Sequence, residues 1–135
     1  MGGADIGVSE DRDNTERYLI EYAIGQKIPL LGVCRGMQFM ASYFGAKLKR
    51  VTGHVRTRHT VSGEIISDVN SFHNFAIESC PPQFRVIARS SDGEIEAIRS
   101  DHFGWEGWMW HPEREKVFDG NQLARAKAIL SGHPI

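Results

Sequence analysis

The sequence predicts a three-layer α/β domain built around a mostly parallel sheet. A short continuous apolar run over residues 28–33 is typical of a strand that is buried on both faces. A helical pattern over 35–44 follows this run at once, and another helical pattern over 121–130 closes the chain. Strand-like segments lie between these helices, so mixed strands and helices are expected to pack in layers. With 135 residues the chain can form one domain with a core, and we expect residues 1–135 to be a single domain.

The individual elements follow from local patterns. Residues 13–26 carry apolar side chains at helical spacing behind a polar start, which predicts a first helix. The helix over 35–44 is expected to end at Gly45, because glycine readily adopts the conformation that closes a helix. Ser91-Asp92-Gly93 predicts a hairpin turn. Strands are expected over 28–33, 46–51, 60–66, 84–90, 94–99 and 103–110, and a strand or turn segment over 69–77.

Composition excludes several classes of protein. The chain is 41% hydrophobic and 24% charged, as an ordinary globular protein is. Its formal net charge of -1 gives no global attraction to nucleic acid or to an anionic membrane. No apolar run approaches the roughly 20 residues that span a bilayer, and the first residues lack the basic and apolar parts of a signal peptide. We read the two cysteines, Cys34 and Cys80, as reduced thiols, so a cytoplasmic protein is expected.

Cys34 is the strongest candidate for a catalytic residue. The pattern Gly32-x-Cys34-x-Gly36 lies between the apolar run and the next helix, where a sharp strand-to-helix turn would expose a nucleophile. The glycines remove the Cβ atoms that would clash in such a turn. The positive end of the helix dipole would favour the thiolate, which is the attacking species. The alternative is a buried cysteine that ends a core strand, and the flanking glycines favour the nucleophile.

A base and a carboxylate follow much later, in His111-Pro112-Glu113. A histidine at the end of a strand can face a nucleophile at the end of a neighbouring strand, because active sites of open α/β sheets lie at the carboxyl ends of strands. Glu113 is close enough in sequence to accept a hydrogen bond from the imidazole and fix its tautomer. Separately, His111 could cap a strand and Glu113 could be a solvated charge. Their association favours a catalytic pair.

Two polar stretches allow two interpretations each. The segment 69–74, which contains Ser71 and His73, is either a polar turn or a loop that grips the polar end of a substrate. The basic stretch 47–59 is either a solvated loop or a cradle for a phosphate or carboxylate group. His54 and His59 could suggest a metal site, yet no carboxylate or thiolate lies within that loop, so we expect no metal and no cofactor.

These motifs, in this order, resemble the class I glutamine amidotransferase superfamily. Residues 32–38 match its Gly-x-Cys-x-Gly-x-Gln motif, 71–73 match its Ser-x-His segment, and 111–113 match its His-Pro-Glu. The Cys-Arg-Gly form of the turn is more similar to the γ-glutamyl hydrolases of the family, which cleave γ-glutamyl-γ-aminobutyrate and related amides, than to the synthase subunits. The resemblance implies a flavodoxin-like three-layer fold with a mostly parallel sheet.

The resemblance also implies a mechanism and a set of site residues. Cys34 would attack the carbonyl carbon of a γ-glutamyl amide, with His111 moving the proton and Glu113 holding His111. Water would then hydrolyse the thioester to glutamate. The backbone N–H groups of Arg35 and Gly3 would hold the oxyanion. Residues that would contact the glutamyl group are Gln38, Ser71, Phe72 and His73.

The start of the chain departs from the family pattern. Gly2-Gly3-Ala4-Asp5 resembles the family's oxyanion loop, which strand–helix units normally precede. A sheet lacking those first strands would expose apolar surface and an unpaired edge. We therefore expect either a dimer that covers this surface or a shortened form with weak activity.

Three functions remain open at this point. The first is a hydrolase that acts on glutamine or on a γ-glutamyl amine conjugate; a nucleotide- or sugar-linked amide would suit the basic stretch 47–59. The second is a glutaminase subunit that supplies ammonia to a separate synthase. The third is an inactive scaffold that keeps the motifs. The expected partners are a small γ-glutamyl substrate and either a second copy of the chain or a synthase, with no nucleic acid and no membrane.

Overall fold

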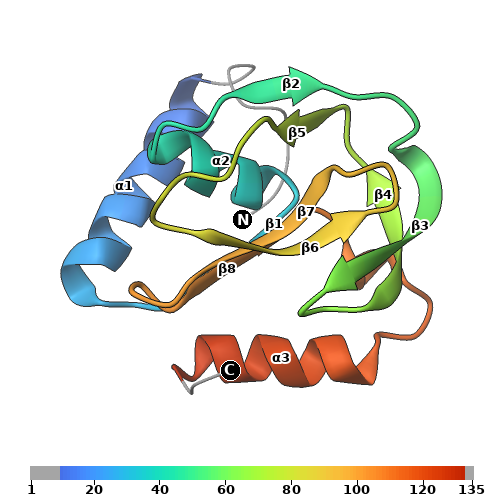
Figure 1. The fold of residues 1–135 in the computed structure, drawn as a ribbon. Helices are drawn as coiled ribbons and strands as arrows, with labels where there is room; N and C mark the ends of the chain where they lie inside the picture. The colour runs from blue at the N-terminus through green and yellow to red at the C-terminus, as the bar shows by residue number, and fades with distance from the viewer. Residues whose placement is uncertain (1–9, 133–135) are drawn as a thin grey trace.

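The computed structural model describes residues 10–132, which fold into three layers (Figure 1). Helices α1 (Glu10–Gln26) and α2 (Arg35–Tyr43) cover one face of a curled sheet, and α3 (Gly120–Leu130) covers the other face. This confirms the predicted α/β architecture with helices on both sides of the sheet. Within the described range, the helices lack the combination of length and apolarity that crossing a bilayer requires.

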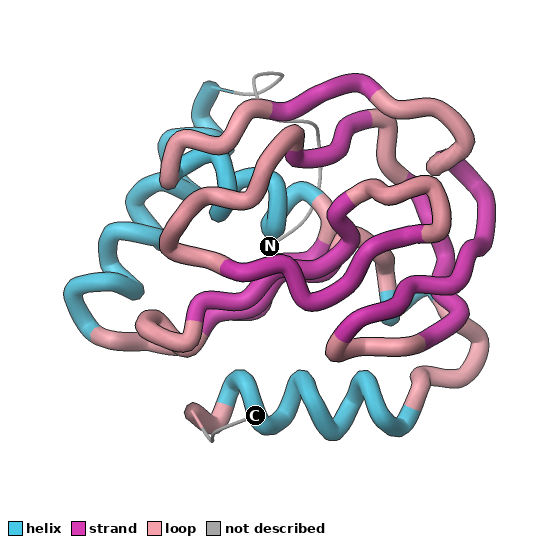
Figure 2. Tube along the Cα trace, viewed as in Figure 1, coloured by secondary structure: helices cyan, strands magenta, loops and turns pink. Residues whose placement is uncertain are grey.

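The main sheet contains six strands in the order β1-β8-β7-β6-β3-β4, and Figure 2 shows the strands curling between the helices. A separate antiparallel pair, β2 and β5, lies beside it. A short 3-10 turn, η1 (Pro112–Arg114), follows the sheet. The strands are β1 (Leu31–Val33), β2 (Leu48–Arg50), β3 (Val55–Gly63), β4 (Ser67–Phe72), β5 (Phe75–Ile77), β6 (Arg85–Ser90), β7 (Ile95–Ser100) and β8 (Trp105–Trp108).

The sheet is mixed, which corrects the expectation of a mostly parallel one. Among the described strands, β1 and β8 pair in parallel, and the other neighbours in the main sheet pair antiparallel. Short turns connect β3 to β4, β6 to β7 and β7 to β8, and such short links permit antiparallel pairing alone. The strand expected over 60–66 also begins earlier, at Val55, and ends at Gly63.

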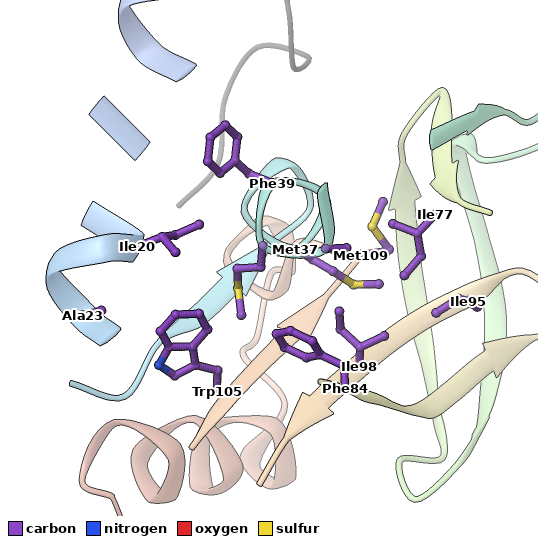
Figure 3. Packing of buried hydrophobic residues seen from close by; sticks show 12 residues of the cluster. Ile20, Ala23, Met37, Phe39, Ile77, Phe84, Ile95, Ile98, Trp105 and Met109 are labelled. Carbon is purple, nitrogen blue, oxygen red and sulfur yellow. The ribbon is translucent and has the colours of Figure 1, made fainter. Parts of the chain in front are cut away.

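The main hydrophobic core lies between the sheet and the helices α1 and α2 (Figure 3). Ile20 of α1, Met37 of α2 and Trp105 of β8 belong to this cluster, and all three are almost completely buried. Ile98 of β7 and Met109 continue the same cluster. A second cluster lies on the other face, where Ile129 of α3 packs with residues that include Trp108 and Trp110.

A buried carboxylate connects α3 to the sheet. Glu106 in β8 is fully buried, and its oxygens accept hydrogen bonds from Arg125 of α3 at 2.6 and 2.8 Å. The indole of Trp108 donates to the same carboxylate at 2.7 Å, and Arg99 of β7 donates at 3.3 Å. Burying this charge is tolerated because it is both paired and well supplied with donors.

Two glycines let α2 lie directly on the parallel strand pair. Gly32 of β1 and Gly107 of β8 are register partners. A Cβ atom on Gly32 would lie 2.6 Å from the Met40 sulfur and 2.7 Å from the Gly36 carbonyl carbon. A Cβ atom on Gly107 would lie 2.7 Å from Cγ of Met37. Any larger residue at either position would therefore push α2 away from the sheet.

Gly32→Ala is expected to destabilise the protein by about 1–3 kcal/mol, because the added methyl group meets backbone atoms that cannot move aside. Urea unfolding of the variant and the parent protein measures this difference. Gly25→Ala in α1 is the matched control. A Cβ atom there meets nothing within 4 Å, so alanine should leave stability unchanged or raise it by up to about 1 kcal/mol. Equal unfolding midpoints for the two variants would contradict the packing argument.

Candidate active site

Cys34 occupies the strained turn that the glycine pattern predicts. It lies between β1 and α2 and is half-buried, with φ 54° and ψ -104°. A positive φ is rare for a residue with a side chain and costs about 1–3 kcal/mol, and such strain concentrates at functional sites. Two hydrogen bonds hold the turn: the Cys34 N–H donates to the Trp108 carbonyl at 2.6 Å, and the Cys34 carbonyl accepts from the Gln38 N–H at 3.1 Å.

His111 follows β8, the strand next to β1. The two strands run parallel, with Val33 opposite Trp108. Cys34 comes directly after Val33, and His111 comes three residues after Trp108. Both residues therefore leave the carboxyl ends of neighbouring parallel strands, where α/β proteins place their active sites. The Cys34–Trp108 hydrogen bond ties the two chain segments together at this edge.

His111 and Glu113 form the expected imidazole–carboxylate pair. Nδ1 of His111 lies 2.8 Å from Oε2 of Glu113. A carboxylate accepts but does not donate, so Nδ1 carries the proton and Nε2 keeps its lone pair when the imidazole is neutral. The His111 side chain is 9% exposed, whereas that of Glu113 is 57% exposed. Pro112 begins the 3-10 turn η1, which brings the carboxylate back toward the ring.

Asn70 holds the backbone of His111 from the other side, a contact that sequence reasoning did not find. Its amide nitrogen donates to the His111 carbonyl at 2.7 Å, and its amide oxygen accepts from the His111 N–H at 2.8 Å. Asn70 is almost completely buried in β4. The sequence marked its segment as polar, but 41 residues separate the two partners, so no local pattern could pair them.

The three residues of the Ser-x-His segment point in different directions. The ring of Phe72 meets the His111 ring edge-on at 6.1 Å, so Phe72 lies beside the candidate base. Ser71 is buried, and its hydroxyl donates to the His54 carbonyl at 2.8 Å. His73 is also buried, with Nδ1 2.9 Å from the Phe75 carbonyl. The side chains of Ser71 and His73 are thus engaged inside the protein, and Phe72 faces the imidazole.

The other expected site residues connect α2 to its surroundings. Gln38 is buried, and its Nε2 donates to the Phe75 carbonyl at 3.0 Å. The buried Arg35 side chain donates to Glu16 of α1 at 3.0 Å and to Asp13. The backbone N–H of Arg35 belongs to the first turn of α2, whose amides point toward the Cys34 end of the helix. Gly3, the second expected oxyanion donor, lies outside the described residues.

Two cations of the basic stretch 47–59, Lys49 and Arg58, form ion pairs with carboxylates. Lys49 pairs with Glu94 at 2.9 Å, and Arg58 pairs with Glu115 at 2.7 Å and with Asp68 at 3.1 Å. Hydrogen bonding to Arg58 holds the pKa of Glu115 below its usual value. These pairings disfavour a role for the Lys49 and Arg58 side chains in holding an anionic ligand.

Comparisons with known proteins identify the family of this chain. The model of the family "Glutamine amidotransferase class-I" matches residues 7–130. The chain is 34% identical to a γ-glutamyl-CDP-amidate hydrolase of Campylobacter jejuni, covering 92% of this chain and 65% of that protein. It is 39% identical to a glutamine-hydrolyzing GMP synthase subunit of Methanothrix thermoacetophila, covering 87% of this chain and 73% of that protein.

The fold has a counterpart among solved structures. A glutamine amidotransferase from Thermotoga maritima superposes with a TM-score of 0.70 at 20% identity, covering 97% of this chain and 62% of that one. The chain thus spans about two thirds of the length of the proteins it matches. Because the family model covers nearly the whole sequence, the chain belongs to the class I glutamine amidotransferase family.

Proposed function

We propose that the chain hydrolyses a γ-glutamyl amide through a thioester on Cys34. The observation that carries the proposal is the placement of a strained cysteine and a His111–Glu113 pair on the adjoining ends of two parallel strands. Similarity to a γ-glutamyl-CDP-amidate hydrolase supports an amide of the γ-carboxyl group of glutamate as the substrate class. Glutamine and γ-glutamyl amine conjugates share that reacting bond.

In the proposed mechanism the Cys34 sulfur attacks the amide carbonyl carbon while Nε2 of His111 takes the thiol proton. The tetrahedral intermediate then collapses: the C–N bond breaks and the proton passes from His111 to the leaving amine. Water, deprotonated by His111, hydrolyses the thioester and releases glutamate. Glu113 keeps Nε2 available by accepting the hydrogen bond from Nδ1 and stabilises the imidazolium when it forms.

The turn after Cys34 also suits the developing negative charge. The Arg35 N–H lies in the first turn of α2, where the helix dipole favours an anion. We propose this amide as one oxyanion donor and Gly3 as the second. Phe72 would line the site next to His111, since their rings are in contact.

The remaining expected residues would contact the glutamyl group in different ways. Ser71 and His73 would bind it through backbone carbonyls, because their side chains are engaged elsewhere and the His73 N–H already donates to the His54 carbonyl at 2.8 Å. Gln38 would contact it with Oε1, since its Nε2 donates to the Phe75 carbonyl.

A second candidate function is that of a glutaminase that supplies ammonia to a synthase. Similarity to a GMP synthase subunit favours it. An exposed apolar face on α1 also suits a protein partner: Tyr18 is 67% exposed, Tyr22 50% and Leu19 44%. Strand β1 lies at the edge of the described sheet. We propose that this face makes a protein contact, either with a second copy of the chain or with a synthase.

Cys34→Ala is expected to abolish glutamate release from glutamine and from γ-glutamyl amides, because no thioester can form. The loss should be at least about 10⁴-fold in kcat, as for other enzymes that lose their nucleophile. Release of glutamate, measured with and without a candidate synthase, gives the readout. Activity that survives in this variant would exclude Cys34 as the nucleophile.

Cys80→Ala is the matched control for loss of a thiol. Burial raises the pKa of the Cys80 thiol, so it should be a poor nucleophile and its removal should leave the rate unchanged. A γ-glutamyl-like electrophile should therefore label Cys34 and spare Cys80, as peptide mass spectrometry would show. If the parent protein turns over no substrate, alone or with a synthase, the inactive-scaffold interpretation holds instead.

Asn70→Ala is expected to lower kcat by about ten- to a hundredfold, because the backbone of His111 loses both hydrogen bonds that position the ring. KM should change less, because the contacts of Asn70 are with the backbone of His111 and we assign it no role in substrate binding. Asn70→Asp keeps the acceptor for the His111 N–H and should recover part of kcat. Asn121→Ala, at an exposed position of α3, is the surface control. A rise in KM alone would contradict the positioning role.

For the case in which the exposed face of α1 binds a second copy of the chain, we expect self-association. Sedimentation velocity should show a dimer, and replacing Tyr18 and Tyr22 together with serine should shift it to monomer, because both side chains are at least half exposed. Replacing Val117 with serine, another exposed apolar residue away from α1, should leave the dimer intact. A parent protein that stays monomeric at high concentration would refute self-association.

A further inference from the structure

A buried cluster of three histidines and one glutamate lies apart from the candidate catalytic pair. Its centre is Oε1 of Glu96, a β7 residue that is 1% exposed. Nδ1 of His54 lies 3.2 Å from this oxygen, Nε2 of His59 3.3 Å and Nε2 of His73 3.5 Å. The histidines come from the residue before β3, from within β3 and from the link between β4 and β5. Distant segments of the chain therefore meet at one oxygen.

All four of these atoms are buried and lack a hydrogen-bond partner among the described residues. An unsatisfied buried polar group costs about 1–3 kcal/mol, so four in one place form an expensive arrangement. Their convergence on a single point indicates that a positively charged species belongs between them. The remaining question is whether protons or a metal ion supply that charge.

In His54 and His73, the ring nitrogen that faces away from Glu96 is hydrogen-bonded to an acceptor. The lone pair of the other ring nitrogen therefore faces Glu96. Nδ1 of His73 lies 2.9 Å from the Phe75 carbonyl, which can only accept, so Nδ1 carries the proton and Nε2 faces Glu96 with a lone pair. Nε2 of His54 lies 2.7 Å from Oδ2 of Asp92, which likewise leaves Nδ1 of His54 as the free base. An imidazole held by a carboxylate or carbonyl through its second nitrogen is the usual environment of a metal-binding histidine.

The spacing of the atoms also suits a metal ion. Ligands about 2.0–2.1 Å from a tetrahedral Zn²⁺ stand about 3.3–3.4 Å from one another. The three nitrogen–oxygen distances of 3.2–3.5 Å match such edges and are long for charge-assisted hydrogen bonds. The ligand atoms of His54, His73 and Glu96 all lie within 4.8 Å of one another, close enough to share one ion after small side-chain movements.

We propose that His54, His73 and Glu96 bind a divalent transition-metal ion of the Zn²⁺ type, with His59 available as the fourth ligand. Two or three imidazoles with one carboxylate suit Zn²⁺ and its neighbours, whereas Mg²⁺ and Ca²⁺ prefer oxygen ligands. Burial, together with the neighbouring histidines, lowers the pKa of His59 against the pull of Glu96, which favours the neutral imidazole that a metal requires. The inference does not depend on the proposed function.

The ion would have a structural role beside the candidate active site. It would join β7 to β3 and to the β4–β5 segment, which places Phe72 and Asn70 against His111. The Phe75 carbonyl, which accepts from His73, also accepts from Gln38 of the helix that follows Cys34. A closed set of buried protein ligands is typical of structural rather than catalytic zinc.

The first experiment uses the intact chain, purified without a histidine tag. After dialysis against chelator, Co²⁺ and Zn²⁺ should each bind with a stoichiometry of one per chain, and bound Co²⁺ should show the visible absorption of a tetrahedral site. Zn²⁺ should raise the thermal midpoint of the chelated protein, because it binds the folded state. Absence of stoichiometric binding, with an unchanged midpoint, would overturn the proposal and assign the cluster to shared protons.

Variants then locate the ion. Glu96→Gln and His73→Gln should each weaken Zn²⁺ binding by at least about a hundredfold, and Asp92→Asn by about ten- to a hundredfold through its hold on His54. His102→Gln, an exposed histidine outside the cluster, is the matched control and should bind as the parent does. Zn²⁺ affinity that survives Glu96→Gln and His73→Gln unchanged would overturn the assignment. Because the cobalt titration uses the parent protein, a variant that fails to fold does not decide the result.

Discussion

The close approach of α2 to the parallel pair β1–β8 is the constraint on which the rest of the structure depends. Gly32 and Gly107 face each other across the pair, and neither leaves room for a side chain beneath the helix. Without that contact the chain could not turn from β1 into α2 within one residue, and Cys34 would not lie at the bend. The same strand pairing places the segment after β8, and with it His111, at the edge of the sheet where the cysteine emerges.

Strand β4 and the link to β5 make different contacts on their two faces. Asn70 and Phe72 contact His111, while Ser71 and His73 point into the protein interior. This alternation follows from the two-residue period of a strand. The segment 71–73 therefore has two roles in this chain. Ser71 and His73 support the buried histidine–glutamate cluster, and Phe72 lies beside the candidate base. Stability and the geometry of the site are coupled through one short segment.

Two buried ion pairs among the described residues join different elements of the fold. Arg35 joins α2 to Glu16 of α1, and Glu106 joins β8 to Arg125 of α3. Each pair connects a helix to the layer or helix beneath it, so the charges fix how the helices lie as well as contributing hydrogen bonds. The cluster around Glu96 differs from these pairs, because its facing atoms have no donor between them among the described residues.

Local patterns in the sequence determined the helices, the turn at Cys34 and the His111–Glu113 contact, because each depends on residues close together in the chain. The turn at Cys34 needs the glycines two positions before and after it. The imidazole of His111 reaches the carboxylate of Glu113, two residues further along the chain. Tertiary structure alone decided the mixed pairing of the sheet, the hold of Asn70 on His111 and the meeting of His54 and His73 with Glu96. The basic stretch lacked a carboxylate of its own, and β7 supplied one from far along the chain. These contacts join residues that lie far apart in the sequence. No repeating pattern indicates which of them will meet, so only the folded structure reveals the contacts.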